Sequence, residues 1–359
     1  MILLLIFLLT VFAFTIYVLK KNKALSTNKP CHFVFTKEWS FVLKGILAIL
    51  IVLHHISTHR ELWCPEDTSW YVYIFDQLIP LSPIFVGMFF FISGYGVMTS
   101  FNRTQGEYIK TFLIKRFSKV LIPWLTLSVI CLLIIKLWLH PDFNIWVRCL
   151  TFFITGKSFL LGWFIPVLIM FYLFFYLLFR FFPNKIAVYA LLLVVTIISL
   201  YFRLRGFGIH WWTSNLCFPV GVLYACMEKY IPNISEKCRY LCFNLLNLLV
   251  MGLIIVIASG HYGLTQLVLS LACCVLLVWY SYLHQIKKPG RILSFLSNIS
   301  YELFLVHILL LRIADVYLPT YNLSIYVITP ALLLISVILS WFFHMVFQKV
   351  SNSILPKGR

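Results

Sequence analysis

The stretch SFVLKGILAILIVLHHIST, residues 40–58, decides the fold of this chain. It is long enough to cross a bilayer as one helix, because a transmembrane helix needs about 20 mainly apolar residues. Similar windows recur along the whole sequence. Of 359 residues, 62% are hydrophobic and only 11% are charged, whereas about a quarter of an ordinary globular domain is charged. The sequence therefore predicts an all-α, polytopic membrane helix bundle.

We expect about eleven transmembrane helices, which share this length and composition. They lie near 2–19, 40–58, 78–100, 120–139, 159–182, 186–202, 211–228, 241–259, 262–283, 297–314 and 324–347. A cleaved signal peptide carries positive charge before its apolar run and a small-residue cleavage site after it. The window at 2–19 has no leading charge and is followed by Lys20 and Lys21. We expect it to be a retained helix.

The formal net charge of +18 is a signal of topology. Clustered Lys and Arg can mark a nucleic-acid binder, but most of the 29 basic residues here fall in alternate short loops between the predicted spans. Positive residues concentrate in the cytoplasmic loops of membrane proteins. We therefore expect a multi-pass protein of the cell inner (plasma) membrane with its N-terminus outside and its C-terminus in the cytoplasm. Its partners would include membrane lipids and no nucleic acid.

The ten cysteines form no disulfide or zinc pattern. Six of them share a position inside predicted spans: Cys131, Cys217, Cys226, Cys242, Cys273 and Cys274. We expect reduced, structural cysteines and no bound metal.

Ionisable residues inside spans are costly and are usually functional. In the window 40–58, Lys44 lies near one end and His54 and His55 near the other. At about 100° per residue, His55 points within roughly 20° of Lys44 and His54 about 80° away, and the axial distance from Lys44 to His55 is about 16 Å. Alternatively, Lys44 extends to the membrane surface and the histidines lie at the opposite interface.

Two further stretches carry polar side chains. Arg116 and Lys119 are three residues apart, hence neighbours on one helical face. Such a face binds a phosphate, for which Arg supplies bidentate contacts, although ordinary cytoplasmic-side charges have the same appearance. Glu302 and His307 lie in the span 297–314, which is expected to run outward, so that His307 reaches a depth similar to that of His55. Their directions differ by about 140°, and each either serves a site or joins helices.

The order of these features resembles the acyltransferase-3 family, bacterial membrane acyltransferases that modify extracytoplasmic glycans, often by O-acetylation. The resemblance rests on Lys44 and His55 with ten residues between them, FFFISGY at 89–95, Arg116 to Pro123, and SYELFLVH at 300–307. It covers roughly Lys37 to Phe347, with further similar stretches at 163–165 and 218–221. The small residues in 89–96 also allow close helix approach.

The resemblance implies a ten-helix core, so we divide the chain into an N-terminal transmembrane anchor with a basic loop (1–36), an acyltransferase-like membrane domain (37–349) and a cytoplasmic tail (350–359). It implies His55 as the catalytic histidine, with His54, Glu302 and His307 as further candidates. It places acyl-CoA, most simply acetyl-CoA, on Lys44, Arg116 and Lys119. The family usually has arginine where Lys44 and Lys119 stand, and lysine lacks the planar donor fork of arginine.

The expected reaction moves an acyl group to a hydroxyl of a glycan or lipid-linked glycan. His55 would act as general base or as nucleophile. Outer aromatic residues would stack on sugars or form an interfacial belt: Trp63, Trp70, Tyr71, Tyr73, Trp211 and Trp212. The rival interpretations are a transporter or flippase for a lipid-linked sugar and a non-catalytic sensor or scaffold. A homo-oligomer is compatible with each.

Overall fold

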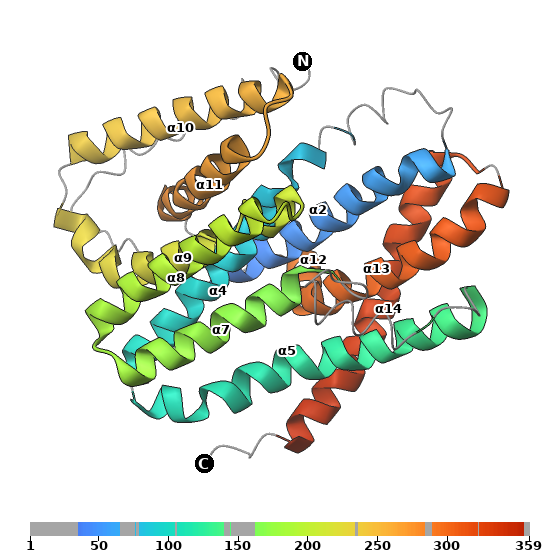
Figure 1. Ribbon diagram of the computed structural model, residues 1–359, viewed down its shortest axis with the longest axis horizontal. Helices are drawn as coiled ribbons and strands as arrows, with labels where there is room; N and C mark the ends of the chain where they lie inside the picture. The colour runs from blue at the N-terminus through green and yellow to red at the C-terminus, as the bar shows by residue number, and fades with distance from the viewer. Residues whose placement is uncertain are drawn as a thin grey trace. The chain divides into compact units, whose positions relative to one another are not determined.

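The computed structural model describes residues 35–64, 76, 79–104, 106–139, 144, 162–233, 236–283, 289–321 and 323–354. All regular structure in these ranges is helical (Figure 1). This confirms the predicted all-α fold. The predicted span 2–19 lies outside the described residues, and so do most of the anchor 1–36 and the end of the tail 350–359.

Nine helices in the described ranges are long and apolar enough to cross a membrane. They comprise α2 (Lys37–Trp63), α4 (Ser82–Thr104), α5 (Gly106–Ile134), α7 (Phe164–Phe181), α8 (Asn184–Leu204), α10 (Glu236–Ala258), α11 (Leu264–Leu283), α13 (Ser300–Tyr317) and α14 (Ile325–Ile354). Large apolar side chains such as Leu133, Leu193 and Ile338 remain exposed on these helices, because lipid rather than water surrounds a membrane span. The chain is a multi-pass membrane protein.

The remaining elements are short. They are η1 (Ile79–Leu81), the π-helical turn η2 (Ile135–Leu139), η3 (Ile209–Trp211), α9 (Cys217–Met227), η4 (Glu228–Asn233), α12 (Arg291–Asn298) and η5 (Leu318–Thr320).

The chain forms two compact units. The first contains Pro80–Thr99, Leu192–Pro289 and the described residues up to Val42; the second contains the described residues of Leu43–Ile79, Ser100–Leu191 and Gly290–Arg359. In the first unit α11 packs against α10 and α9. In the second, α13 packs against α14, α5 packs against α7, and α5 also contacts α13 and α14.

In the first unit, α4 and α9 approach each other at two glycines. A Cβ atom at Gly94 would collide with the backbone of Phe218, and one at Gly221 would collide with the backbone of Phe91. The close helix approach predicted for 89–96 is thus confirmed, and its partner is the similar stretch at 218–221. We call these four residues the glycine contact; its role is packing.

In the second unit, α2 and α13 run in the same direction. At one end of the contact, Gly45 lies so close to Ser297, just before α13, that an added Cβ would be 2.8 Å from the serine Oγ. At the other end, His59 contacts Asp315. Residue numbers therefore rise together along both helices, as expected if both run outward.

This direction bears on the number of crossings. Helices that cross in succession alternate in direction, so α2 and α13, the first and eighth of the nine described candidate spans, would be antiparallel. If all nine cross, their parallel contact requires an odd number of further crossings in the chain between them. The sequence places a span at 211–228, where α9, with 11 residues, continues directly into η4, with 6. At about 1.5 and 2.0 Å per residue the pair measures about 28 Å, close to the hydrocarbon thickness of about 30 Å.

Candidate active site

Four histidines gather where α2 meets α13 in the second unit. We call His54, His55, His59 and His307 the histidine cluster. The ring of His55 lies 5.2 Å from that of His307 and 4.7 Å from that of His54, measured between centroids. The similar depth predicted for His55 and His307 is therefore confirmed. His54 and His307 are buried, whereas His55 remains partly exposed, so His55 is the more open of the two adjacent α2 histidines.

The tautomer of His307 follows from its hydrogen bond. Its Nδ1 lies 2.8 Å from the backbone oxygen of Leu303, one turn earlier in α13. A carbonyl oxygen only accepts, so Nδ1 carries the proton, and in the neutral ring Nε2 holds a lone pair. Nε2 is buried and has no hydrogen-bond partner among the described residues. His307 thus presents an acceptor nitrogen inside the cluster.

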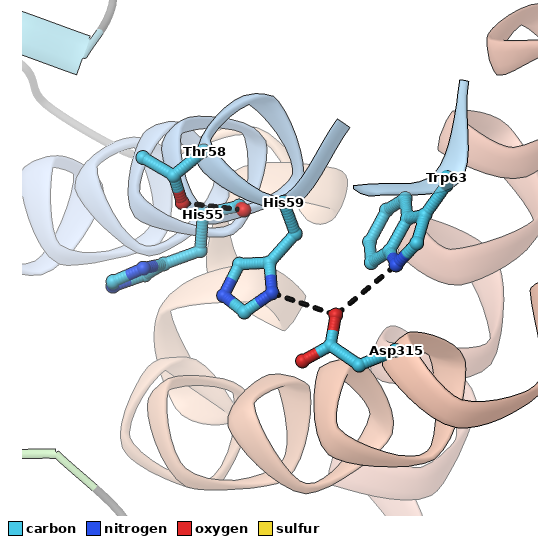
Figure 2. A network of polar contacts seen from close by, with 5 residues as sticks. All are labelled: His55, Thr58, His59, Trp63 and Asp315. Carbon is cyan, nitrogen blue, oxygen red and sulfur yellow. Dashed lines mark hydrogen bonds and ion pairs between the residues drawn. The ribbon is translucent and has the colours of Figure 1, made fainter. Parts of the chain in front are cut away.

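His59 is held by a carboxylate that sequence reasoning missed. Its Nδ1 lies 2.8 Å from Oδ1 of Asp315, and Nε1 of Trp63 donates to the same oxygen over 3.0 Å (Figure 2). Two signals were available in the sequence. His59 follows His55 by one helical turn, and Asp315, one of only 11 acidic residues, comes directly after the predicted span 297–314.

Lys44 and Arg116 form a basic cluster at the other end of the α2–α13 contact. They are close enough for mutual electrostatic repulsion. Nε and Nη2 of Arg116 donate to the Tyr108 hydroxyl over 3.2 and 3.0 Å. Neither cation forms an ion pair with a carboxylate in the part of the chain that the structure describes. Lys119 is exposed on α5, and no polar contact joins it to the described residues.

Packing in the second unit brings three distant stretches of sequence together. Next to Lys44, Gly45 lets α2 approach the start of α13 at Ser297. One residue after Lys119, the backbone oxygen of Val120 accepts a 2.6 Å hydrogen bond from the Tyr301 hydroxyl. The segments 44–55, 116–123 and 300–307, which carried the family resemblance, therefore meet around α13.

Glu302 and His307 have different partners, as their predicted directions require. Oε1 of Glu302 lies 3.2 Å from Nδ1 of His344 on α14, and Nε2 of His344 contacts Gln348. The other carboxyl oxygen, Oε2, is buried without a hydrogen-bond partner among the described residues. Glu302 thus joins α13 to α14, and His344 is a partner that sequence reasoning did not identify.

The aromatic side chains expected to stack on sugars do not present open faces where they are described. Trp63, Trp211 and Trp212 are buried. Trp63 donates to Asp315, and the guanidinium carbon of Arg203 lies 5.3 Å from the Trp212 ring centre. Trp70, Tyr71 and Tyr73 lie outside the described residues.

The described residues contain neither a disulfide nor a group of metal ligands. None of the seven cysteines whose side chains the structure describes forms a disulfide, and no three His, Cys, Asp or Glu side chains in those ranges are grouped as metal ligands. The histidine cluster has the geometry of acid–base or nucleophilic chemistry.

Comparison with known proteins assigns the chain to a family. The model of a family described as an acyltransferase domain matches residues 38–345. No curated protein and no solved structure matches the chain. The match spans most of the sequence and contains the basic cluster, the histidine cluster and the helices that carry them. The chain belongs to the acyltransferase-3 family and is a membrane acyltransferase.

Proposed function

We propose that this protein transfers an acyl group, most simply acetyl, from cytoplasmic acyl-CoA to a hydroxyl of an extracytoplasmic or lipid-linked glycan. One observation carries the proposal: the basic cluster and the histidine cluster lie at opposite ends of the same α2–α13 contact. The family match favours acyl transfer over the transporter interpretation.

The donor binds through its phosphates at the basic cluster. Two neighbouring cations repel each other, and a bound anion relieves that repulsion. Lys44 and Arg116 form no ion pair with any described carboxylate, so both charges remain for the phosphates. Lys119, one turn from Arg116, supplies a further cation at the same helix face. Lys44 and His55 are about 16 Å apart along α2, which suits an extended pantetheine arm.

The orientation follows from the distribution of basic residues. In this proposal the Lys44 end of α2 faces the cytoplasm, where acyl-CoA is made, and the protein lies in the inner membrane with its N-terminus outside and its C-terminus in the cytoplasm. The histidine cluster then lies toward the outer side, where the acceptor arrives.

His55 acts on the thioester by one of two routes. As general base, it takes the proton of the acceptor hydroxyl while the hydroxyl oxygen attacks the acyl carbon and the C–S bond breaks. As nucleophile, its nitrogen forms a bond to the acyl carbon, the CoA thiolate leaves, and the acceptor later releases the acyl group from the imidazole. Both routes need an open imidazole, and His55 is partly exposed.

The test supplies the purified full-length protein, reconstituted in lipid, with radiolabelled acetyl-CoA and cell-envelope glycans from its host. We expect label to enter the glycan. The His55→Ala protein is the matched control for background acetylation. Movement of lipid-linked sugar without covalent label would contradict acyl transfer and support a flippase.

A further inference from the structure

We propose that His59, oriented by Asp315, is a second catalytic histidine, the base that removes the proton from the acceptor hydroxyl. This inference rests on the acyl transfer proposed above, takes the route on which His55 is the nucleophile, and assigns a residue to its acceptor step. Neither His59 nor Asp315 belongs to the stretches that carried the family resemblance.

The contact with Asp315 fixes the chemistry of the His59 ring. A carboxylate oxygen at this distance accepts from an Nδ1–H of His59, so Nε2 holds the lone pair in the neutral form of the ring. A carboxylate in this position orients the imidazole and stabilises the imidazolium that forms when Nε2 takes a proton. The arrangement is that of a histidine base, and Nε2 of His59 has no partner among the described residues that would occupy it.

The Asp315 carboxylate is held in place by Trp63, and the neighbouring cation on α2 pairs with a different carboxylate. Trp63 donates its indole N–H to the same Oδ1 over 3.0 Å, which limits rotation of the Asp315 side chain. The neighbouring cation on α2, Arg60, has its own acidic partner, because its Nη2 lies 2.8 Å from Oδ2 of Asp76. Asp315 is therefore a positioning residue for His59.

Exposure separates His59 from the buried members of the cluster. The His59 and Asp315 side chains are 29% and 18% exposed, whereas His307 is 1% exposed. A hydroxyl arriving from outside the helix pair can reach His59 but not His307. Figure 2 shows the His59 ring directed at Asp315, with His55 one turn earlier on the same helix.

The spacing of His55 and His59 suits two reacting groups. Four residues separate them by about 6 Å along the helix axis and about 40° around it. A base has to lie about 3 Å from the oxygen whose proton it takes. An acceptor hydroxyl between the two rings can therefore contact Nε2 of His59 while its oxygen faces an acyl carbon at His55.

With His59 as the base, His55 acts as the nucleophile, and the proton and the bonds balance on that route. The acceptor oxygen forms a bond to the acyl carbon, and its proton moves to Nε2 of His59. The bond that breaks in this step is the C–N bond between the acyl group and His55, and its electron pair stays on the imidazole nitrogen; the C–S bond to CoA has already broken when His55 took the acyl group. The His59 proton then passes to the CoA thiolate released in the acylation step, which leaves as the thiol. An acylated His55 cannot itself be the base, so a second base is needed on that route.

The test uses His59→Asn in the full-length protein. The asparagine amide nitrogen occupies nearly the position of Nδ1 and can still donate to Asp315, but it cannot take a proton. We expect the turnover number for label transfer from acetyl-CoA to glycan to fall about 100-fold or more. The dissociation constant for acetyl-CoA and the melting temperature should stay unchanged.

A matched control and a rescue distinguish chemistry from structure. Thr58→Ala removes the neighbouring hydroxyl, whose one hydrogen bond among the described residues goes to the backbone oxygen of His55, and should keep full activity. His59→Gly should lose transfer and regain part of it when imidazole is added as a free base. Asp315→Asn should lower turnover without changing acetyl-CoA binding, because the amide no longer fixes the tautomer.

The outcomes are separable. If the wild-type protein labels glycan and His59→Asn does so equally fast, the inference is wrong and the proposed function stands. If His59→Asn also loses acetyl-CoA binding or thermal stability, or imidazole restores nothing to His59→Gly, the His59–Asp315 contact only joins two helices, and the inference is again wrong. A wild-type protein that labels no glycan overturns the proposed function and this inference together.

Discussion

The glycine contact of the first unit and the α2–α13 contact of the second unit both bring two helices close together, by different means. At the glycine contact, backbone meets backbone, because Gly94 and Gly221 have no side chain. Along α2–α13, imidazoles and a carboxylate from the two helices meet. Small residues are sufficient to pack helices in a membrane, whereas ionisable side chains there are costly. Close helix packing therefore needs no titratable group, and the ionisable side chains along the α2–α13 contact indicate a functional site.

The largest effect is expected from filling the glycine contact. Gly94→Leu should abolish folded protein, because its Cβ alone collides with the Phe218 backbone, which cannot move aside as a side chain can. The measurement is membrane abundance and monodisperse yield after extraction. Gly96→Ala is the matched control, since an added Cβ there meets nothing within 4 Å, and it should leave abundance unchanged. Normal yield of Gly94→Leu would contradict the packing role.

The next largest effect is a loss of activity with no change in membrane abundance. His55→Ala should lower acyl transfer by about 100-fold to 10,000-fold, because it removes the proposed base or nucleophile. Membrane abundance should be unchanged, since His55 is partly exposed. His261→Ala, at an exposed position in the first unit, controls for the loss of any histidine. Surface-glycan acylation retained by His55→Ala would refute its role.

A smaller effect is expected at the basic cluster. Arg116→Ala removes charge-assisted contacts to the donor phosphates, worth about 1.5–3 kcal/mol, so the acetyl-CoA dissociation constant should rise about 10-fold to 100-fold. Calorimetry on detergent-purified protein measures it. Tyr108→Phe is the control for loss of the hydroxyl that accepts from Arg116, and it should change the constant less. An unchanged constant in Arg116→Ala would count against phosphate binding here.

The smallest effect is expected where charge is kept. Lys44→Arg restores the residue that the family usually has and preserves the positive charge, so activity should stay within a few fold of wild type. Lys44→Met, which keeps the length of the side chain and removes the charge, should weaken acetyl-CoA binding more than Lys44→Arg does. A large loss in Lys44→Arg would show that the space around Lys44 has adapted to the smaller ammonium group.

Much of the fold and part of the candidate site follow from local sequence. A run such as 40–58 forms a spanning helix whatever surrounds it, because a backbone inside lipid must satisfy its own hydrogen bonds. Helical periodicity alone gives the relation between Lys44 and His55, and it separates Glu302 from His307 on α13. Local sequence does not show that the predicted span 211–228 is divided among η3, α9 and η4.

By itself the sequence determined the membrane helices, their apolar surfaces and the order of polar residues along each one, because these depend on neighbours within a few turns. Only the tertiary structure decided which side chains meet. It paired His59 with Asp315, 256 residues away, brought Lys44 within electrostatic range of Arg116 and assigned Glu302 to His344. Such partners come from different helices, and the packing of those helices depends on the shapes of all their faces together. The periodicity of one helix carries no information on how that helix packs against others.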